Sequence, residues 1–159
     1  MRWLAKDGAL YVESKSYIDT LLVPLVSVSF GEKVKKSGND YEFLQLITTH
    51  LERQFQGRIL LLPTVIYPEE LSDSYKKILA EELFQRFPEE DFQHRFFIST
   101  TVDLKDEVEK NGGIFIFLPS IPLEHIDGPN RLSIIENQVR QLSPLVVDRW
   151  QEVERRKNT

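Results

Sequence analysis

The 159-residue sequence contains no cysteine, which excludes disulfide bonds, thiolate metal sites, iron–sulfur clusters and cysteine nucleophiles and fits a reducing compartment. It also lacks a long hydrophobic run. The longest apolar stretch, Leu21 to Phe30, is interrupted by Pro24, Ser27 and Ser29 and is too short to cross a bilayer. The first residues have neither the apolar run nor the small-residue cleavage site of a secretory signal. We therefore expect a cytoplasmic protein without membrane insertion.

An excess of positive charge is also absent. The chain has 20 lysines and arginines against 25 acidic residues, a net charge of −5, so it lacks the basic excess that drives binding to nucleic-acid phosphates. No G-x-G-x-x-G or G-x-x-x-x-G-K-[ST] motif cradles a phosphate, and no H-E-x-x-H or G-x-S-x-G motif marks a metal or a nucleophile. The sequence predicts no nucleic-acid partner, no metal and no cofactor.

The sequence does contain an α/β pattern. Four segments rich in apolar, β-branched and aromatic residues are typical of parallel strands buried on both faces: 20–28, 58–66, 95–102 and 113–118. The connection before the last segment is so short that this strand could be antiparallel. We expect one three-layer domain over residues 1–159, with about four mostly parallel strands flanked by helices. Its topology would be Rossmann-like or flavodoxin-like, without a dinucleotide fingerprint.

Capping residues predict where the helices begin. Asn39 and Glu42 form a capping-box pattern before a helix that ends near Gly57, and the serines around Asp73 cap a helix that ends at Pro88. A short helix after Asp7 should pack Trp3, Leu4 and Tyr11 onto the body.

A long helical pattern follows Gly128-Pro129-Asn130 and is interrupted by Pro144. A proline inside a helix costs about 3 kcal/mol, but it is tolerated at a first helical position, and Ser143 is a good N-cap. Residues 143–159 are therefore predicted to form a kinked or separate helix.

Three predicted strands run into a proline: Pro24, Pro63 and Pro119. Proline cannot donate to the strand ladder, so these residues suit strand ends. The carboxyl ends of parallel strands share one edge, where ligands usually bind. Polar residues expected at that edge could bind a small ligand or form ordinary caps and turns: Thr64, Tyr67, Glu69, Ser99, Thr100, Asp103, Ser120, Glu124, His125 and Asp127.

Two groups of residues suggest more specific chemistry. Lys33, Lys35 and Lys36 lie in a predicted loop beside a helix N-terminus, where they could attract an anion or simply belong to a solvated loop. His125 lies beside acidic residues, with Asp103 from the preceding strand end, and imidazole with carboxylates is suited to acid–base chemistry.

The opening residues resemble the YpiF-like family of small proteins from Bacillus-type bacteria, on the runs Met1-Arg2-Trp3, Lys6-Asp7, Tyr11, Tyr17-Ile18-Asp19-Thr20 and Leu22-Val23-Pro24-Leu25. The resemblance implies a bacterial cytosolic protein and carries over no catalytic residue. It draws attention to Trp3, Asp7, Tyr17 and Asp19. Asp19 precedes a strand and is expected to cap or to pair with the N-terminal segment.

Because every catalytic signature is weak or missing, we expect a non-catalytic binding or regulatory module that acts through protein contacts. Its partner would be another protein or a second copy of the chain, held on the exposed side of Gln138–Lys157 or on the strand edge. The alternative is a small-molecule enzyme or ligand-binding protein with Asp103, Ser120 and His125 at the carboxyl edge. The shape of that edge distinguishes the two.

Overall fold

In the part of the chain that the structure describes, five strands form one parallel sheet. The computed structural model describes residues 1–87 and 90–159. The strands are β1 (Thr20–Val28), β2 (Ile59–Leu61), β3 (Val65–Pro68), β4 (His94–Ser99) and β5 (Ile114–Phe117). All recorded strand pairs are parallel, so the mostly parallel sheet is confirmed and the last strand is not antiparallel.

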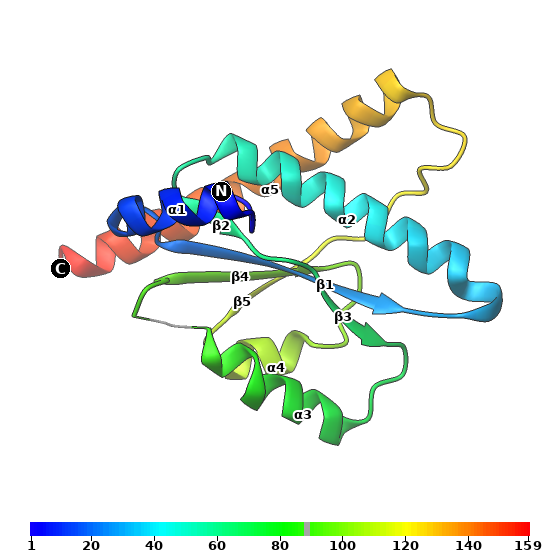
Figure 1. Ribbon diagram of the computed structural model, residues 1–159, viewed down its shortest axis with the longest axis horizontal. Coiled ribbons are helices and arrows are strands. Elements are labelled where there is room, and N and C mark those ends of the chain that lie inside the picture. The colour runs from blue at the N-terminus through cyan, green and yellow to red at the C-terminus, as the bar shows by residue number, and fades with distance from the viewer. Residues whose placement is uncertain (88–89) are drawn as a thin grey trace.

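Helices cover both faces of the sheet. They are α1 (Ala5–Ser14), α2 (Val34–Gln54), α3 (Asp73–Glu82), α4 (Lys105–Lys110) and α5 (Gly128–Lys157), with short 3₁₀ helices at Lys15–Tyr17, Gly31–Lys33 and Phe84–Arg86. Helices α2 and α5 lie over one face, and α3 and α4 lie over the other (Figure 1). This is the predicted α/β architecture with helices on both sides.

The strand order is β2-β1-β4-β5, and β3 also pairs with β1. The chain first moves from β1 to β2 and β3 on one side, then passes back to β4 on the other side. Right-handed crossovers in opposite directions place their helices on opposite faces. The strand order therefore reverses between β1 and β4, and their carboxyl ends diverge into different loops.

Alternate residues of β1 belong to different cores. Leu22 and Val26 pack with α2, α5 and the facing residues of the other strands, whereas Leu21, Val23 and Leu25 pack with residues of α3 and α4. This alternation is the two-residue period of a strand buried on both faces. It explains why the segment reads as a continuous apolar run.

Pro24 lies in the middle of the central strand rather than at its end. Leu22 O accepts a hydrogen bond from Leu62 N at 3.0 Å, so Pro24, two residues further along, faces the same neighbour without an N–H to donate. Strand β2 ends and β3 begins on either side of this position. The prediction of one strand over 58–66 is wrong because the ladder is interrupted there.

Helix α2 begins at Val34, not at Asn39 as predicted. Ser37 Oγ donates to Ser27 O at 3.0 Å and accepts from Ser29 N at 3.1 Å, which fastens the first turns of α2 to the end of β1. The lysines of this segment are good helix formers. The expected solvated loop is therefore mostly helix. Asn39 lies inside this helix, so its side chain does not cap the helix N-terminus.

Helix α5 is one helix across Pro144. Ser143 is not an N-cap, because its hydroxyl donates back into the helix, with Oγ 2.8 Å from Val139 O and 2.9 Å from Gln54 Oε1. The separate helix considered for 143–159 is absent: residues through Lys157 continue α5. Burial of apolar side chains on both sides of the proline offsets its cost of about 3 kcal/mol: Ile135, Val139, Leu142, Val146 and Trp150.

Two further helix predictions have different outcomes. Ser72 caps α3 as predicted and accepts a hydrogen bond from Tyr75 N at 3.2 Å, whereas the predicted helix end at Pro88 lies outside the described residues. Helix α1 begins before Asp7, and Trp3 and Leu4 are exposed instead of packed on the body.

A polar cluster fastens α5 to the amino ends of the strands. Asp19 accepts hydrogen bonds from Arg58 Nε at 3.0 Å and Nη2 at 3.1 Å, so its partner is not the N-terminal segment. The Arg58 guanidinium lies 3.9 Å from the ring centroid of Trp150, and Trp150 Nε1 donates to Thr20 Oγ1 at 2.9 Å. One cation–π contact thus connects two distant parts of the chain.

His94 lies buried beside this cluster, with Nε2 3.9 Å from Asp19 Oδ2. Among the described residues, its Nδ1 has no hydrogen-bond partner. Burial lowers the pKa of His94. Asp19 opposes this shift, while the positive charges of Arg58, Arg149 and Lys157 add to it.

We predict that acid destabilises the fold through His94. The unfolded chain takes up this proton more readily, so the free energy of unfolding should fall as the pH drops below about 6.5. Urea unfolding between about pH 7.5 and 5.5 should show a smaller pH dependence for His94→Leu than for the wild type. His125→Leu, at an exposed position, should keep the wild-type dependence. An unchanged slope in His94→Leu would contradict the prediction.

Candidate functional site

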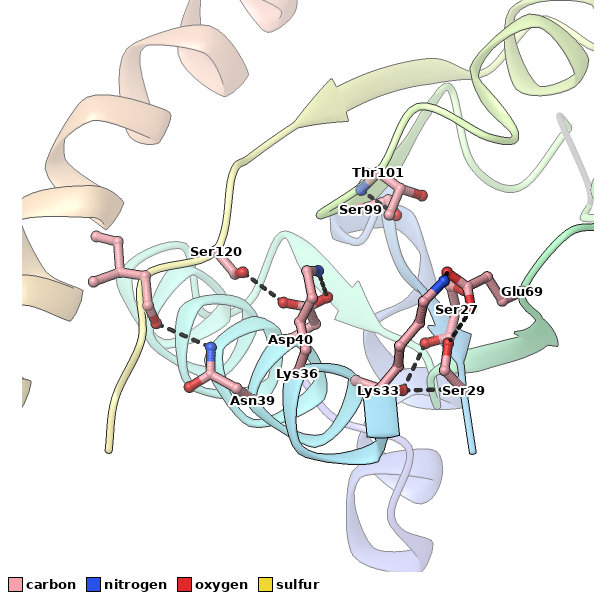
Figure 2. A network of polar contacts seen from close by, with 12 residues as sticks. Ser27, Ser29, Lys33, Lys36, Asn39, Asp40, Glu69, Ser99, Thr101 and Ser120 are labelled. Carbon is pink, nitrogen blue, oxygen red and sulfur yellow. Dashed lines mark hydrogen bonds and ion pairs between the residues drawn. The ribbon is translucent and has the colours of Figure 1, made fainter. Parts of the chain in front are cut away.

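A cleft of about 470 Å³ opens at the carboxyl edge of the sheet, between the ends of β1, β3 and β4 and the first turns of α2. We call it the inner cleft. All of its lining residues have polar or charged side chains, and the network around it is drawn in Figure 2. The lining residues are Ser27, Ser29, Lys33, Lys36, Ser37, Asp40, Glu69, Glu70, Thr101 and Asp103.

Asp40 projects from α2 at the boundary of the inner cleft. Lys36 Nζ donates to Asp40 Oδ2 at 2.7 Å, and Ser120 Oγ donates to Oδ1; both side chains point toward the carboxylate in Figure 2. Only 8% of the Asp40 side chain is exposed, compared with 73% for Lys36. A carboxylate this buried depends on its partners, because an unpaired buried charge is costly.

Lys33 and Glu69 form an ion pair across the mouth of the cleft, with Nζ and Oε1 separated by 3.0 Å. Ser29 Oγ donates to Glu69 Oε2 at 2.9 Å. The hydrogen bond from Lys33 lowers the pKa of Glu69, and the same bond raises the pKa of Lys33. Both side chains are well exposed, so the pair is open to exchange with a ligand at little cost.

Thr101 and Asp103 line the inner cleft beyond β4, and the buried Tyr67 of β3 lies behind them. The Tyr67 hydroxyl lies 2.8 Å from Thr101 Oγ1 and donates to Asp103 Oδ2 at 3.2 Å, and Thr101 Oγ1 donates to the same oxygen at 3.0 Å. Ser99 Oγ accepts from Thr101 N at 3.3 Å. Burial raises the pKa of Tyr67 to about 12, so the phenol keeps its proton and stays a donor.

A second hollow, the outer cleft, occupies about 970 Å³ on the other side of the Lys36–Asp40 pair. Lys35 and Glu124 form an ion pair at its rim. Asn39 connects α2 to the loop after β5, since its Nδ2 donates to Ile121 O at 3.1 Å and its Oδ1 accepts from Leu123 N at 2.9 Å. Lys36 and Asp40 line both clefts, so they separate the two compartments.

Three other residues predicted to bind a ligand or to act in catalysis lie outside the inner and the outer cleft. The Thr64 hydroxyl accepts from Gln45 Nε2, and Asp127 is the N-cap of α5, with Oδ1 accepting from Asn130 N at 2.9 Å. His125 is 86% exposed, with Nε2 3.5 Å from Glu124 Oε1. Neither Thr64 nor Asp127 lines the inner or the outer cleft.

The three candidates for catalysis do not meet. Asp103 lines the inner cleft, Ser120 lines the outer cleft, and His125 lines neither. Within residues 1–87 and 90–159, no group of three or more metal-binding side chains is arranged to hold an ion. The structure therefore does not bring these three side chains into one cleft.

Asp40 and Asn39 are the residues that the sequence pattern failed to identify. Asn39 was assigned to helix capping with Glu42, because asparagine followed by glutamate three positions later is a common N-terminal signature, and Asp40 was given no role. The available signal was the spacing of Lys36 and Asp40, which places them four residues apart on one helix face. The contacts of Asn39 and Asp40 with the loop after β5 join residues that are about half the chain apart. Such contacts cannot be recognised from a local sequence pattern.

An apolar groove of about 550 Å³ lies between α1 and the strands β1 and β2, apart from the two clefts. Leu60 and Leu62 line it together with Trp3 and Tyr11. The Tyr11 ring stacks on Phe92, with centroids 6.0 Å apart. This surface differs from the clefts in being almost without polar side chains.

Comparison with known proteins identifies the family. The family described as "Protein of unknown function (DUF2487)" matches residues 9–150. The chain belongs to this family. Its relative "Uncharacterized protein YpiF" from Bacillus subtilis (strain 168) is 31% identical over 152 residues, which cover 94% of this chain and 98% of the relative. The resemblance to YpiF-like bacterial proteins is thereby confirmed.

The family match spans every residue of both clefts and of the sheet. No solved structure matches the chain. In the part of the chain that the structure describes, no helix combines the length and the apolar character that a membrane span requires.

We predict that Asn39 holds the loop after β5 in place. Asn39→Ala leaves Leu123 N and Ile121 O without their partner, which should lower the free energy of unfolding by about 1–3 kcal/mol. Hydrogen exchange at the Leu123 amide should accelerate by at least about tenfold. Asn137→Ala, which removes only a contact to Arg140 on the exposed side of α5, is the control. Wild-type exchange at Leu123 in Asn39→Ala would refute this role.

Proposed function

We propose that the domain is a non-catalytic binding module whose inner cleft receives a small polar ligand. One observation carries the proposal: the cleft opens at the carboxyl ends of β1 and β4, where the strand order reverses. Open α/β sheets, including Rossmann-like and flavodoxin-like ones, bind their ligands at such a position. The volume of about 470 Å³ lies within the range of ligand pockets, roughly 300–1,000 Å³.

The chemistry of the lining supports binding rather than turnover. Hydroxyl groups, two lysines and several carboxylates offer donors and acceptors to a ligand, but Asp103, Ser120 and His125 lie in separate places. General acid–base catalysis needs its groups within hydrogen-bond reach of one another or of one substrate. Because the absence of cysteine fits a reducing compartment, we place this binding in the cytoplasm.

We predict that filling the inner cleft abolishes binding. NMR titration of the ¹⁵N-labelled chain with arginine, glutamate, phosphate and glucose should shift the amides of Ser37 and Thr101 for at least one compound. Ser29→Phe places a ring in the cleft and should weaken that binding by at least about tenfold. Ser133→Phe, at an exposed position on α5, should leave it unchanged.

Two results would contradict this proposal. One is that none of the four compounds shifts an amide of the inner cleft. The other is that the Ser29→Phe protein, with its thermal unfolding unchanged, binds as the wild type does.

A second candidate function is self-association through the apolar surface around α1. No residue of Ala5–Ser14 is buried, and the side chains of Trp3 and Val12 are 64% and 76% exposed. Trp3 and Tyr11 line the apolar groove, and Val12 belongs to the same helix as Tyr11. The surface around α1 thus carries exposed apolar side chains and a groove in which a second copy could bury its own. The predicted surface on α5 is less suited, because Arg149 and Arg156 both pair with Glu152 there.

We predict that the chain forms a dimer whose interface includes α1. Sedimentation equilibrium at about 0.5 mM should give twice the monomer mass, and the double substitution of Trp3 and Val12 by glutamate should give the monomer. Val102→Glu introduces the same charge at another exposed apolar residue and should leave the dimer intact. A monomeric wild type at this concentration would exclude the second candidate.

A further inference from the structure

The charges in the inner cleft are unequal. Four carboxylates, those of Asp40, Glu69, Glu70 and Asp103, share the cleft with two lysines. Each lysine already pairs with one of them, Lys33 with Glu69 and Lys36 with Asp40. Among the described residues, neither Glu70 nor Asp103 forms an ion pair, although the charge of Glu70 contributes to the raised pKa of Lys33. The cleft therefore has a surplus of negative charge.

Asp103 is held in one orientation by neutral donors. The Tyr67 hydroxyl and Thr101 Oγ1 both donate to Oδ2, and within the described part of the chain Oδ1 accepts no hydrogen bond. Tyr67 is 2% exposed and packed in the core, so its hydroxyl holds Oδ2 from the protein interior. Asp103 itself is solvent-exposed. A carboxylate with one oxygen fixed and the other open is preorganised to accept a donor.

An anionic ligand would meet an energetic obstacle here. Lys33 could leave the exposed Glu69 to meet it, but the other lysine, Lys36, would have to leave Asp40, whose side chain is 8% exposed. That exchange would leave a buried carboxylate without its cation, which costs several times what an exposed ion pair is worth. A cationic ligand needs no such exchange, because it can bind Asp103 with both existing ion pairs intact.

We propose that the ligand of the inner cleft is a small organic cation whose ammonium or guanidinium group donates to Asp103 Oδ1. This inference rests on the proposed function of the cleft and specifies its ligand class. Asp103 supplies the charged anchor, Thr101 and Tyr67 position it, and Glu70 adds to the attraction at the rim. Charge-assisted hydrogen bonds of this kind are stronger than those between neutral groups.

The test compares two cations, agmatine and spermidine, with two anions, phosphate and citrate, at equal ionic strength. NMR titration of the full chain should show that the cations shift the amides of Thr101 and Asp103 and that the anions do not. Asp103→Asn should weaken cation binding by about tenfold or more. Asp106→Asn removes the same charge from the exposed first turn of α4 and should have less than about a twofold effect.

The outcomes separate this inference from the proposed function. If phosphate or citrate shifts these amides and the cations do not, the ligand class is wrong and the cleft is still a binding site. If the cations bind equally well to Asp103→Asn, the anchor is wrong. If none of the four probes shifts an inner-cleft amide, both this inference and the proposed function lose their support.

Discussion

The parallel pairing of β1 with β4 is the constraint on which the rest of the structure depends. It aligns Thr20 to Leu25 with His94 to Ser99, across a separation of about half the chain. Because β2 and β3 occupy the other side of β1, this pairing reverses the strand order and sends the two following loops apart. The inner cleft exists because these loops diverge, and α2 closes it from one face.

A missing hydrogen-bond donor shapes the other side of the central strand. Pro24 cannot donate to the ladder, and the neighbouring segment leaves β1 at this point before it pairs again as β3. The second pairing carries Tyr67 to a position below the end of β4, where its hydroxyl reaches Thr101 and Asp103. The missing N–H of Pro24 in the central strand thus helps to orient the Asp103 carboxylate at the surface.

Two aspartates at this edge illustrate how environment decides the use of a side chain. Asp40 is buried, and its oxygens are occupied by Lys36 and Ser120, so it joins α2 to the segment after β5. Asp103 is exposed and held on one oxygen only, so it can receive a partner from outside. The first stabilises the edge, and the second is suited to recognition.

The sequence alone determined the strands and helices whose residues repeat a local pattern. The apolar run of β1 and the Ser72 cap of α3 each depend on neighbours in the chain, and they were predicted correctly. The resemblance to YpiF-like proteins also came from the sequence. Tertiary structure decided the start of α2, where Ser37 bonds to β1, and the continuity of α5, where packing outweighs Pro144. It also decided which polar residues share a cleft, because contacts such as Asp40 with Ser120 join segments that no local pattern relates.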